Sequence, residues 1–227
     1  RTIARMLESA AAHKLIAVIH DAYYPCGLSR TYPNLVNVEG VAGEEAEHSI
    51  APETRSRHDV MLPITRCLMG PVDYTPECYK KDSIKTHAHP IAMTGVYHGR
   101  PFLRGGMRQW SAGGEGGGEI EFIEKLPGVF DEMKVVAEPG QYVTVARRRG
   151  DDWLVASMSD GHARSLKLPL DFLRPGVAYH ASIHSDVPGG PETSHSTLPV
   201  TSGSVIPIRS EERRVEKECR SRWWPDH

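Results

Sequence analysis

The first half of the chain alternates helical patterns with short apolar runs. Residues Thr2 to His13 carry apolar side chains at helical spacing, which predicts a helix. Leu15 to His20 and Asn34 to Val38 are each short and bounded by turn residues, so each is predicted to be a buried strand. This order of elements is typical of the α/β class.

Two more helices are predicted before residue 100. Arg57 to Met69 places its apolar side chains on one face, although Pro63 limits the helix that precedes it. Ser83 to Val96 also has one apolar face, and Pro90 is expected to break or kink it. Residues 104–118 are rich in glycine, and we expect them to form a loop.

From Val135 onward, the period changes to the alternation that is typical of strands. Arg149 to Asp152 is a hairpin turn signal. The pattern predicts an all-β second half, an antiparallel β-sandwich. Its predicted strands are Gln141 to Arg147, Trp153 to Ser157, Ser165 to Leu168, Val177 to Ile183 and Val205 to Ile208.

Composition narrows the class of function. The 227 residues include 27 Lys and Arg and 29 Asp and Glu, the net charge is −2, and the basic residues are scattered. We therefore expect no nucleic-acid partner. No membrane partner is expected. No signal peptide or membrane span is recognisable, but this absence carries no information because the N-terminus is expected to be missing. The four cysteines lack the CxxC spacing of metal and redox sites, and free thiols are expected.

Three carboxylates follow the predicted strands closely. Asp21 stands at the end of the first strand and Glu39 at the end of the second. Glu45 comes six residues after Glu39, and Gly40 and Gly43 allow the loop between them to turn back. Because barrel enzymes build their sites where strands end, these residues are candidates for one site. The alternative is that all three are solvated surface acids.

A series of short motifs carries a specific resemblance to a known family. In chain order they are His20-Asp21, Pro25 and Gly27, Arg30-Thr31-Tyr32-Pro33-Asn34, Glu39-x3-Gly43-x-Glu45, His58-x4-Pro63-Ile64-Thr65-Arg66, Gly70-Pro71-Val72-Asp73-Tyr74-Thr75-Pro76, Thr86-His87-Ala88-His89 and Trp153. With these motifs, residues 1–208 resemble glycoside hydrolase family 97. The resemblance implies an exo-acting α-glycosidase, either an α-glucosidase or an α-galactosidase, that uses calcium.

The resemblance also implies a domain organisation. Family members have an N-terminal β-sandwich, a central (β/α)8 barrel and a C-terminal β-sandwich. A whole barrel needs about 250 residues, so this chain is expected to be a C-terminal fragment. We predict the C-terminal part of the barrel at residues 1–129 and the sandwich at residues 130–208. The resemblance further implies that the full-length protein is periplasmic or secreted.

The last residues, 209–227, break with the strand pattern that precedes them. They resemble translated read-through into a sequencing adapter, and we expect them to be an artefactual tail. Their charge density and paired tryptophans leave one alternative, a genuine basic, amphipathic tail that binds a partner.

The resemblance assigns roles to the carboxylates. Glu45 matches the general acid and Glu39 a calcium ligand, and Glu45 and Asp21 are expected to ligate calcium as well. Glu44, one residue off register, is the alternative acid. At the position of Asp21, inverting members carry Glu as base and calcium ligand, whereas retaining members carry Gly and use an Asp on an earlier strand. Because a carboxylate is retained here, we favour Asp21 as a catalytic residue of an inverting enzyme.

Other polar residues complete the predicted site. Those expected to bind sugar hydroxyls are His20, His87 and His89, each with a structural histidine as the alternative. Those expected to hold the loop and buttress the carboxylates are Arg30, Tyr32 and Asn34. The expected partner is an oligosaccharide or α-glycoside substrate. The competing hypothesis is a non-catalytic carbohydrate-binding protein with a degenerate site, which the departures at Asp21 and in the segment from Arg100 to Gln109 favour.

Overall fold

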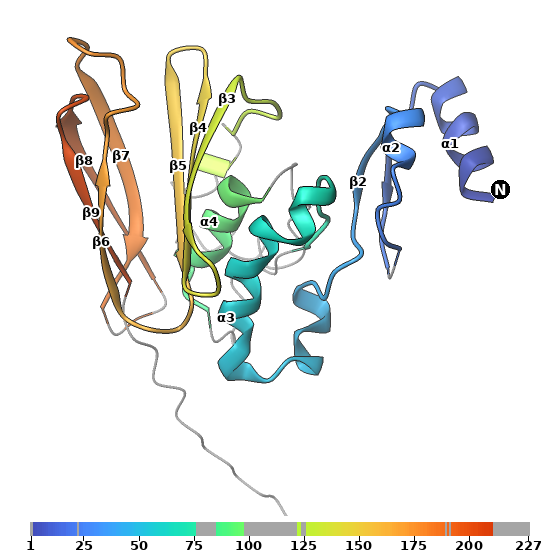
Figure 1. The fold of residues 1–227 in the computed structure, drawn as a ribbon, viewed down its shortest axis with the longest axis horizontal. Helices are drawn as coiled ribbons and strands as arrows, with labels where there is room; N and C mark the ends of the chain where they lie inside the picture. Colours follow the sequence, from blue (N-terminus) through green and yellow to red (C-terminus); the bar gives the residue numbers. More distant parts are fainter. Residues whose placement is uncertain are drawn as a thin grey trace, which may run out of the picture.

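The computed structural model describes residues 2–21, 23–75, 85–97, 122–123, 126–188, 190 and 192–210. A small α/β group lies at one end of the molecule, two helices lie in the middle and antiparallel sheets lie at the other end (Figure 1). The α/β group comprises α1 (Thr2–Ala12), β1 (Ala17–Ile19), α2 (Leu28–Thr31) and β2 (Leu35–Val38). Residues 104–118 and 211–227 lie outside the described part. No helix within the described part is both long and apolar enough to cross a membrane.

Strands β1 and β2 form a parallel pair, which places their carboxyl ends at one edge. Ile19 lies opposite Val38, and Val38 makes a further parallel bridge to Val72. Three backbone segments therefore end close together. The two predicted strands are confirmed, but the first is shorter than expected because Leu15 and Ile16 are 59% and 69% exposed.

Helix α1 has the predicted extent and is fixed to the segment that leads into β2. Its Leu7 is buried against Leu35. The Asn34 side-chain amide donates to the carbonyl oxygen of Leu7 at 3.0 Å, and the Tyr32 hydroxyl donates to Glu8 Oε1 at 3.1 Å. Asn34 and Tyr32 therefore hold a helix in place, rather than the carboxylates that we expected them to buttress.

The predicted helix from Arg57 to Met69 is wrong at both ends. The α-helix α3 spans Pro52–Met61, and the 3-10 turns η2 (Leu62–Ile64) and η3 (Arg66–Met69) follow it. Helix α3 begins at Pro52. A proline suits the first turn of a helix because the N–H that it lacks has no helical partner there. Pro63 lacks the N–H that would continue the α-helix, so the chain tightens into 3-10 turns instead.

Helix α4 (Ala88–Val96) ends where the sequence predicted, but the expected break at Pro90 is wrong. Pro90 lies in the first turn, where no intrahelical hydrogen bond is lost. At the other end, Nη2 of the buried Arg147 donates to the Val96 carbonyl oxygen at 2.9 Å. Burial lowers the pKa of Arg147, and a cation at this end of a helix complements the helix dipole.

The second half forms antiparallel sheets, as predicted. One sheet has the order β3 (Glu132–Glu138), β4 (Tyr142–Arg149) and β5 (Asp152–Ser159), and two strand pairs accompany it, β6 (Arg164–Pro169) with β9 (Val205–Ser210) and β7 (Tyr179–Asp186) with β8 (Thr193–Val200). The sequence analysis missed β3 and β8. Both are mostly exposed, so main-chain pairing holds them and they lack the apolar alternation of a half-buried strand.

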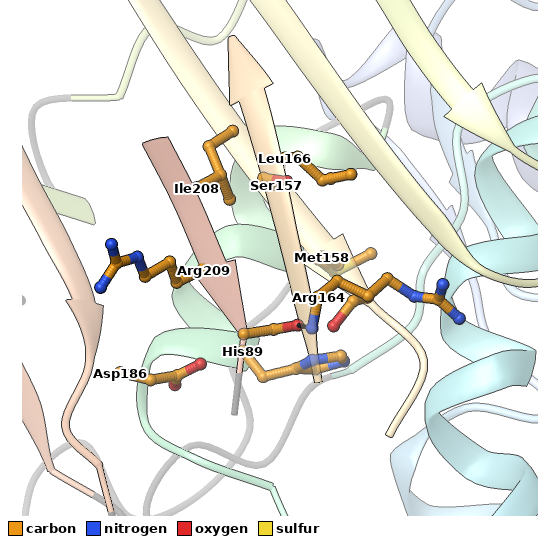
Figure 2. A pocket seen from close by; sticks show the side chains of 10 residues that line it. His89, Ser157, Met158, Arg164, Leu166, Asp186, Ile208 and Arg209 are labelled. Atoms are coloured by element: carbon orange, nitrogen blue, oxygen red, sulfur yellow. Dashed lines mark hydrogen bonds between the residues drawn. The ribbon is translucent and has the colours of Figure 1, made fainter. Parts of the chain in front are cut away.

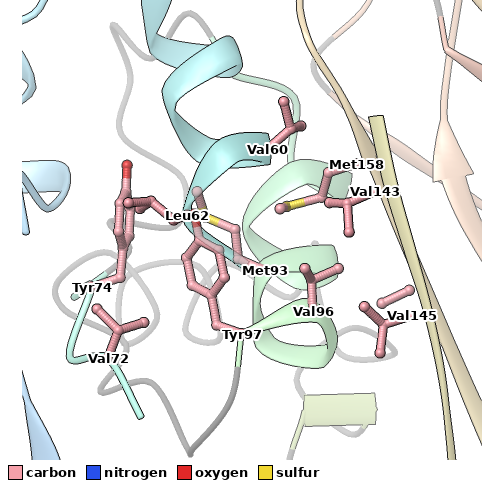
Figure 3. Packing of buried hydrophobic residues seen from close by; sticks show 11 residues of the cluster. Val60, Leu62, Val72, Tyr74, Met93, Val96, Tyr97, Val143, Val145 and Met158 are labelled. Atoms are coloured by element: carbon pink, nitrogen blue, oxygen red, sulfur yellow. The ribbon is translucent and has the colours of Figure 1, made fainter. Parts of the chain in front are cut away.

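The largest core joins the helices to the sheets (Figure 3). Val60 of α3 and Met93 of α4 pack with Val143 of β4, and all three are fully buried. This core therefore spans the predicted division between residues 129 and 130. A second core lies within the sheets, where the rings of Trp153 and Phe172 stand 4.6 Å apart.

Helix α4 approaches β5 most closely at Gly95, where an added Cβ would lie 2.6 Å from the Cβ of Ala156. Changing Gly to Ala inside a helix ordinarily stabilises it by about 1 kcal/mol. We expect Gly95→Ala instead to destabilise the protein by about 1–3 kcal/mol, because overpacking pushes the helix off the sheet. Urea denaturation measures the change. Gly161→Ala, in open space, is the matched control, and a Gly95→Ala protein more stable than wild type contradicts the prediction.

Candidate active site

Three side chains converge where β1 and β2 end. His20 follows β1, Glu39 follows β2, and Glu45 lies in the 3-10 turn η1 (Glu44–Ser49), which the sequence analysis did not predict. One ligand atom from each lies within 4.8 Å of the other two. The Glu39 backbone N–H donates to the Ile19 carbonyl oxygen at 2.8 Å, and this hydrogen bond aligns the carboxyl ends of β1 and β2.

The imidazole of His20 is surrounded by carboxylates. Its Nε2 hydrogen-bonds to Glu45 Oε1, and its Nδ1 lies 3.1 Å from Asp73 Oδ2 and 3.5 Å from Glu39 Oε2. The side chains of His20 and Glu45 are 37% and 33% exposed, whereas those of Glu39 and Asp73 are 7% and 4% exposed. These four residues, which we call the His20 cluster, therefore have one buried side and one open side.

Burial raises the pKa of Glu39 above its ordinary value. The nearby His20 and the backbone N–H of Asp21, which donates to this carboxylate, oppose the shift. The negative charges of Asp73 and Asp21 add to it. A cation placed beside Glu39 would favour its charged form.

Arg66 fixes the end of β2 by binding its main-chain carbonyl groups. Its Nη2 donates to the carbonyl oxygens of Val38 at 2.6 Å and Glu39 at 2.9 Å, and its Nη1 donates to that of Gly70 at 3.1 Å. Burial lowers the pKa of Arg66. The sequence analysis recorded Arg66 within a motif but gave it no role, because main-chain acceptors leave no mark in a sequence.

Two glycines set the path of the loop from Glu39 to Glu45. Gly40 has a φ of +49°, and an added Cβ would lie 2.6 Å from the Tyr23 carbonyl oxygen. At Gly43 an added Cβ would lie 2.6 Å from the Tyr74 carbonyl oxygen and 3.3 Å from Glu39 Oε1. The loop turns back on Glu39 as predicted, and only glycine fits at positions 40 and 43, where the loop passes close to other backbone segments.

Asp21 has a different environment from the other predicted carboxylates. It is exposed and has a left-handed φ of +70°, and its carbonyl oxygen accepts from the Tyr23 N–H at 2.7 Å. Among the described residues, the group with metal-ligand spacing contains His20 rather than Asp21. The catalytic and metal-binding roles of Asp21 stay predictions.

The histidines around α4 face inward. His89 Nε2 lies 3.0 Å from Asp59 Oδ2, and burial lowers the pKa of His87 while the charge of Glu192 opposes that shift. The ring of His89 also borders a hollow beside β5, β6 and β9, together with Arg164 (Figure 2). At about 70 Å³ this hollow is far smaller than ligand pockets of about 300 Å³ or more. Sugar contacts of His87 and His89 stay predictions.

Behind the cluster lies a buried network that sequence reasoning missed. Lys85 Nζ stands 3.0 Å from Glu44 Oε2 and 3.1 Å from Asp59 Oδ2. The Tyr74 hydroxyl donates to Asp59 Oδ1 at 2.5 Å, and His89 contacts Oδ2 of the same carboxylate. We call these five residues the Lys85 network. The Glu44 side chain is only 5% exposed and is paired with Lys85, whereas the Glu45 side chain is 33% exposed. The role of Glu45 as the acid stays a prediction.

Comparisons with known proteins bear on this site. Residues 1–41 match the family model described as "Glycoside hydrolase 97", and residues 129–213 match "Glycosyl-hydrolase 97 C-terminal, oligomerisation". A retaining alpha-galactosidase of Bacteroides thetaiotaomicron is 34% identical over 203 residues, which are 80% of this chain and 29% of that protein. The chain belongs to glycoside hydrolase family 97.

One more curated relative and two solved structures are also similar to this chain. A probable retaining alpha-galactosidase of Streptomyces bingchenggensis is 29% identical over 170 residues, covering 73% of this chain and 26% of that protein. A family 97 enzyme from Pseudoalteromonas sp. strain K8, solved with acarbose, superposes with a TM-score of 0.80 at 24% identity, over 91% of this chain and 35% of that one. A beta-arabinopyranosidase gives 0.73 at 21% identity, over 91% and 34%. The chain thus spans under a third of the two curated relatives' length.

The Lys85 network predicts a pH dependence of stability. Burial pushes the pKa of Asp59 upward, but Lys85, His89 and Tyr74 together hold it below its ordinary value. A lowered folded-state pKa stabilises the protein above the unfolded value of about 3.9, and that stabilisation is lost as the pH falls through the folded-state pKa.

We therefore expect Asp59→Asn to destabilise the family 97 chain by about 3 kcal/mol at pH 7 and by less below about pH 4. Urea denaturation at several pH values measures both differences. Asp131→Asn, which removes an exposed carboxylate with surface partners, should have a small effect at every pH. A loss from Asp59→Asn that stays constant into acid would contradict the assignment.

Proposed function

We propose that this chain is the C-terminal part of an exo-acting α-glycosidase, of the α-galactosidase or α-glucosidase type, that hydrolyses terminal α-linked sugars. The observation that carries the proposal is the convergence of Glu39 and Glu45 on His20 at adjacent strand ends in a family 97 chain. The names of the relatives support the reaction, since two of them are called retaining alpha-galactosidases. An oligosaccharide or α-glycoside is then the substrate.

The fold proposed for the α/β group is the last part of a (β/α)8 barrel. The parallel pairing of β1 with β2 and the parallel bridge to Val72 support it. In such a barrel the active site lies at the carboxyl ends of the strands, where the His20 cluster is. The antiparallel sheets would form the sandwich that covers one side of the barrel. The remaining strands would come from sequence outside the 227 residues, because the relatives are about three times longer.

Glu45 is proposed as the general acid. Cleavage of a glycosidic bond needs a carboxylic acid that protonates the leaving oxygen and a second carboxylate that activates water or attacks the sugar. Glu45 has the partial exposure that contact with a substrate requires, and His20 holds its carboxylate. Asp21 would be the second carboxylate of an inverting enzyme. A retaining enzyme would use an Asp outside the 227 residues, and the names of the two relatives favour this mechanism.

Calcium is proposed as the cofactor, and the residues present fit it. Glu39 and Glu45 offer the hard oxygen ligands that calcium prefers, whereas the imidazole of His20 suits transition metals better and would support the carboxylates by hydrogen bonding. The His20 cluster sets three carboxylates against one imidazole, so it favours an added cation. Among the described groups, Asp73 Oδ1 is buried without a hydrogen-bond partner. Bound calcium would neutralise the carboxylates and act as a Lewis acid toward the substrate.

The test of the acid uses the full-length enzyme. We expect Glu45→Gln to slow hydrolysis of an unactivated α-glycoside by about two to four decades, the usual contribution of general acid catalysis. A 2,4-dinitrophenyl α-glycoside should lose much less, because its leaving group needs no protonation. Glu138→Gln, an exposed glutamate on β3, is the matched control. Equal losses on both substrates, or full activity, would remove Glu45 from this role.

The test of the cofactor combines activity with direct binding. Chelation should lower hydrolysis, and added calcium should restore it. In calorimetric titrations, Glu39→Gln should weaken calcium binding by about 10-fold or more. Asp21→Asn should have the smaller effect, because Asp21 lies outside the group with metal-ligand spacing. Hydrolysis that survives exhaustive chelation, with no calcium binding by calorimetry, would leave Glu39 without this role.

A further inference from the structure

Glu44 and Glu45 are neighbours in the chain, but their side chains point to different places. The Glu44 side chain is 5% exposed and reaches Lys85, whereas the Glu45 side chain is 33% exposed and reaches His20. Two adjacent residues of η1 therefore connect the buried Lys85 network to the open side of the His20 cluster. The position of one carboxylate constrains the other, because they share one backbone.

Two main-chain hydrogen bonds anchor the start of the turn that carries this pair. The Glu44 N–H donates to the Tyr74 carbonyl oxygen at 3.2 Å, and the Ala46 N–H donates to that of Gly43 at 3.0 Å. A 3-10 turn has weaker hydrogen-bond geometry than an α-helix, so side-chain contacts matter more for its orientation. The ion pair of Glu44 with Lys85 supplies such a contact from the protein interior.

Lys85 is itself rigidly held. Its side chain is 1% exposed, and its ammonium group also contacts Asp59 Oδ2 at 3.1 Å. The Asp59 carboxylate is fixed in turn by Tyr74 at 2.5 Å and His89 at 3.0 Å. The Lys85 network thus ties η1 to α3 and α4, the two helices that pack on the large sheet.

We propose that Lys85 is a positioning residue, which holds Glu44 by a buried ion pair and thereby fixes the neighbouring Glu45 for protonation of the leaving group. The proposal rests on the function proposed above. The Lys85 side chain is buried behind the His20 cluster, so in this proposal it acts through Glu44. The competing account is purely structural: one buried ammonium neutralises two buried carboxylates, and the catalytic step does not depend on it.

Leaving-group dependence separates the two accounts. If Lys85 positions the acid, Lys85→Met in the full-length enzyme should lower kcat on a methyl α-glycoside by about 100-fold, within the range that acid catalysis supplies. A 2,4-dinitrophenyl α-glycoside needs no acid and should lose under about 10-fold. Lys85→Arg, which keeps the charge, should recover part of the activity on the methyl glycoside. Equal losses on both substrates from a folded Lys85→Met enzyme would overturn the proposal.

A second variant keeps the proposal testable if Lys85→Met does not fold. Glu44→Gln keeps the shape of the side chain and leaves the ion pair of Lys85 with Asp59 in place, so it should fold and show the same selective loss. Arg164→Met is the matched control, since it breaks the ion pair with Asp160 in the sheets and should lower Tm without changing the ratio of the two rates. An unchanged ratio for Glu44→Gln would also overturn the proposal. A wild-type enzyme that cleaves neither α-galactosides nor α-glucosides would instead refute the proposed function.

Discussion

Hydrogen bonds on both sides of the peptide between Val38 and Glu39 are the constraint on which the candidate site depends. The Glu39 N–H is bound to the Ile19 carbonyl oxygen, and the Val38 carbonyl oxygen accepts from the Asp73 N–H at 3.2 Å. The Arg66 guanidinium donates to the carbonyl oxygens of Val38 and Glu39. Strand β1, the segment after Val72 and the buried Arg66 all hydrogen-bond to Val38 or Glu39. The backbone at Glu39 is therefore fixed where it leaves β2. The carboxylates of Glu39, Asp73 and Glu45 therefore lie around His20 at this edge.

The two groups of ionisable residues differ in how their charge is balanced. In the Lys85 network, an ammonium, a phenol and an imidazole surround the carboxylates, which is the condition under which buried charges are tolerated. In the His20 cluster, one imidazole faces three carboxylates, and burial raises the pKa of Glu39. A buried carboxylate with a perturbed pKa beside a partly open edge is typical of a functional site, whereas a balanced interior network is typical of support. Because of this contrast, we propose a catalytic role for the His20 cluster and a positioning role for the Lys85 network.

The antiparallel sheets contribute to the site through α4. The helix packs on β5 at Gly95, its last carbonyl group binds Arg147 of β4, and its first turn carries His89 to Asp59. A shift of the sheets would therefore move a partner of the Lys85 network. This coupling explains why the main core includes residues from both sides of the domain division predicted from the sequence. The part before residue 130 and the antiparallel sheets differ in architecture, but they share one hydrophobic core.

By itself, the sequence determined the longer helices and the two parallel strands of the first half, most strands of the antiparallel second half, and the placing of Glu39 and Glu45 at one edge, because periodicity and strand-end position are local properties. Two predictions from the sequence were wrong because the context of a residue decides its effect. Pro90 lies in the first turn of α4, where a proline does not break a helix. The strands β3 and β8 are mostly exposed, so they carry no apolar alternation. Only the tertiary structure brought Lys85 to Asp59 and to a glutamate 41 residues away. A buried ion pair between distant segments depends on how helices pack on a sheet, and no spacing along the chain encodes that packing.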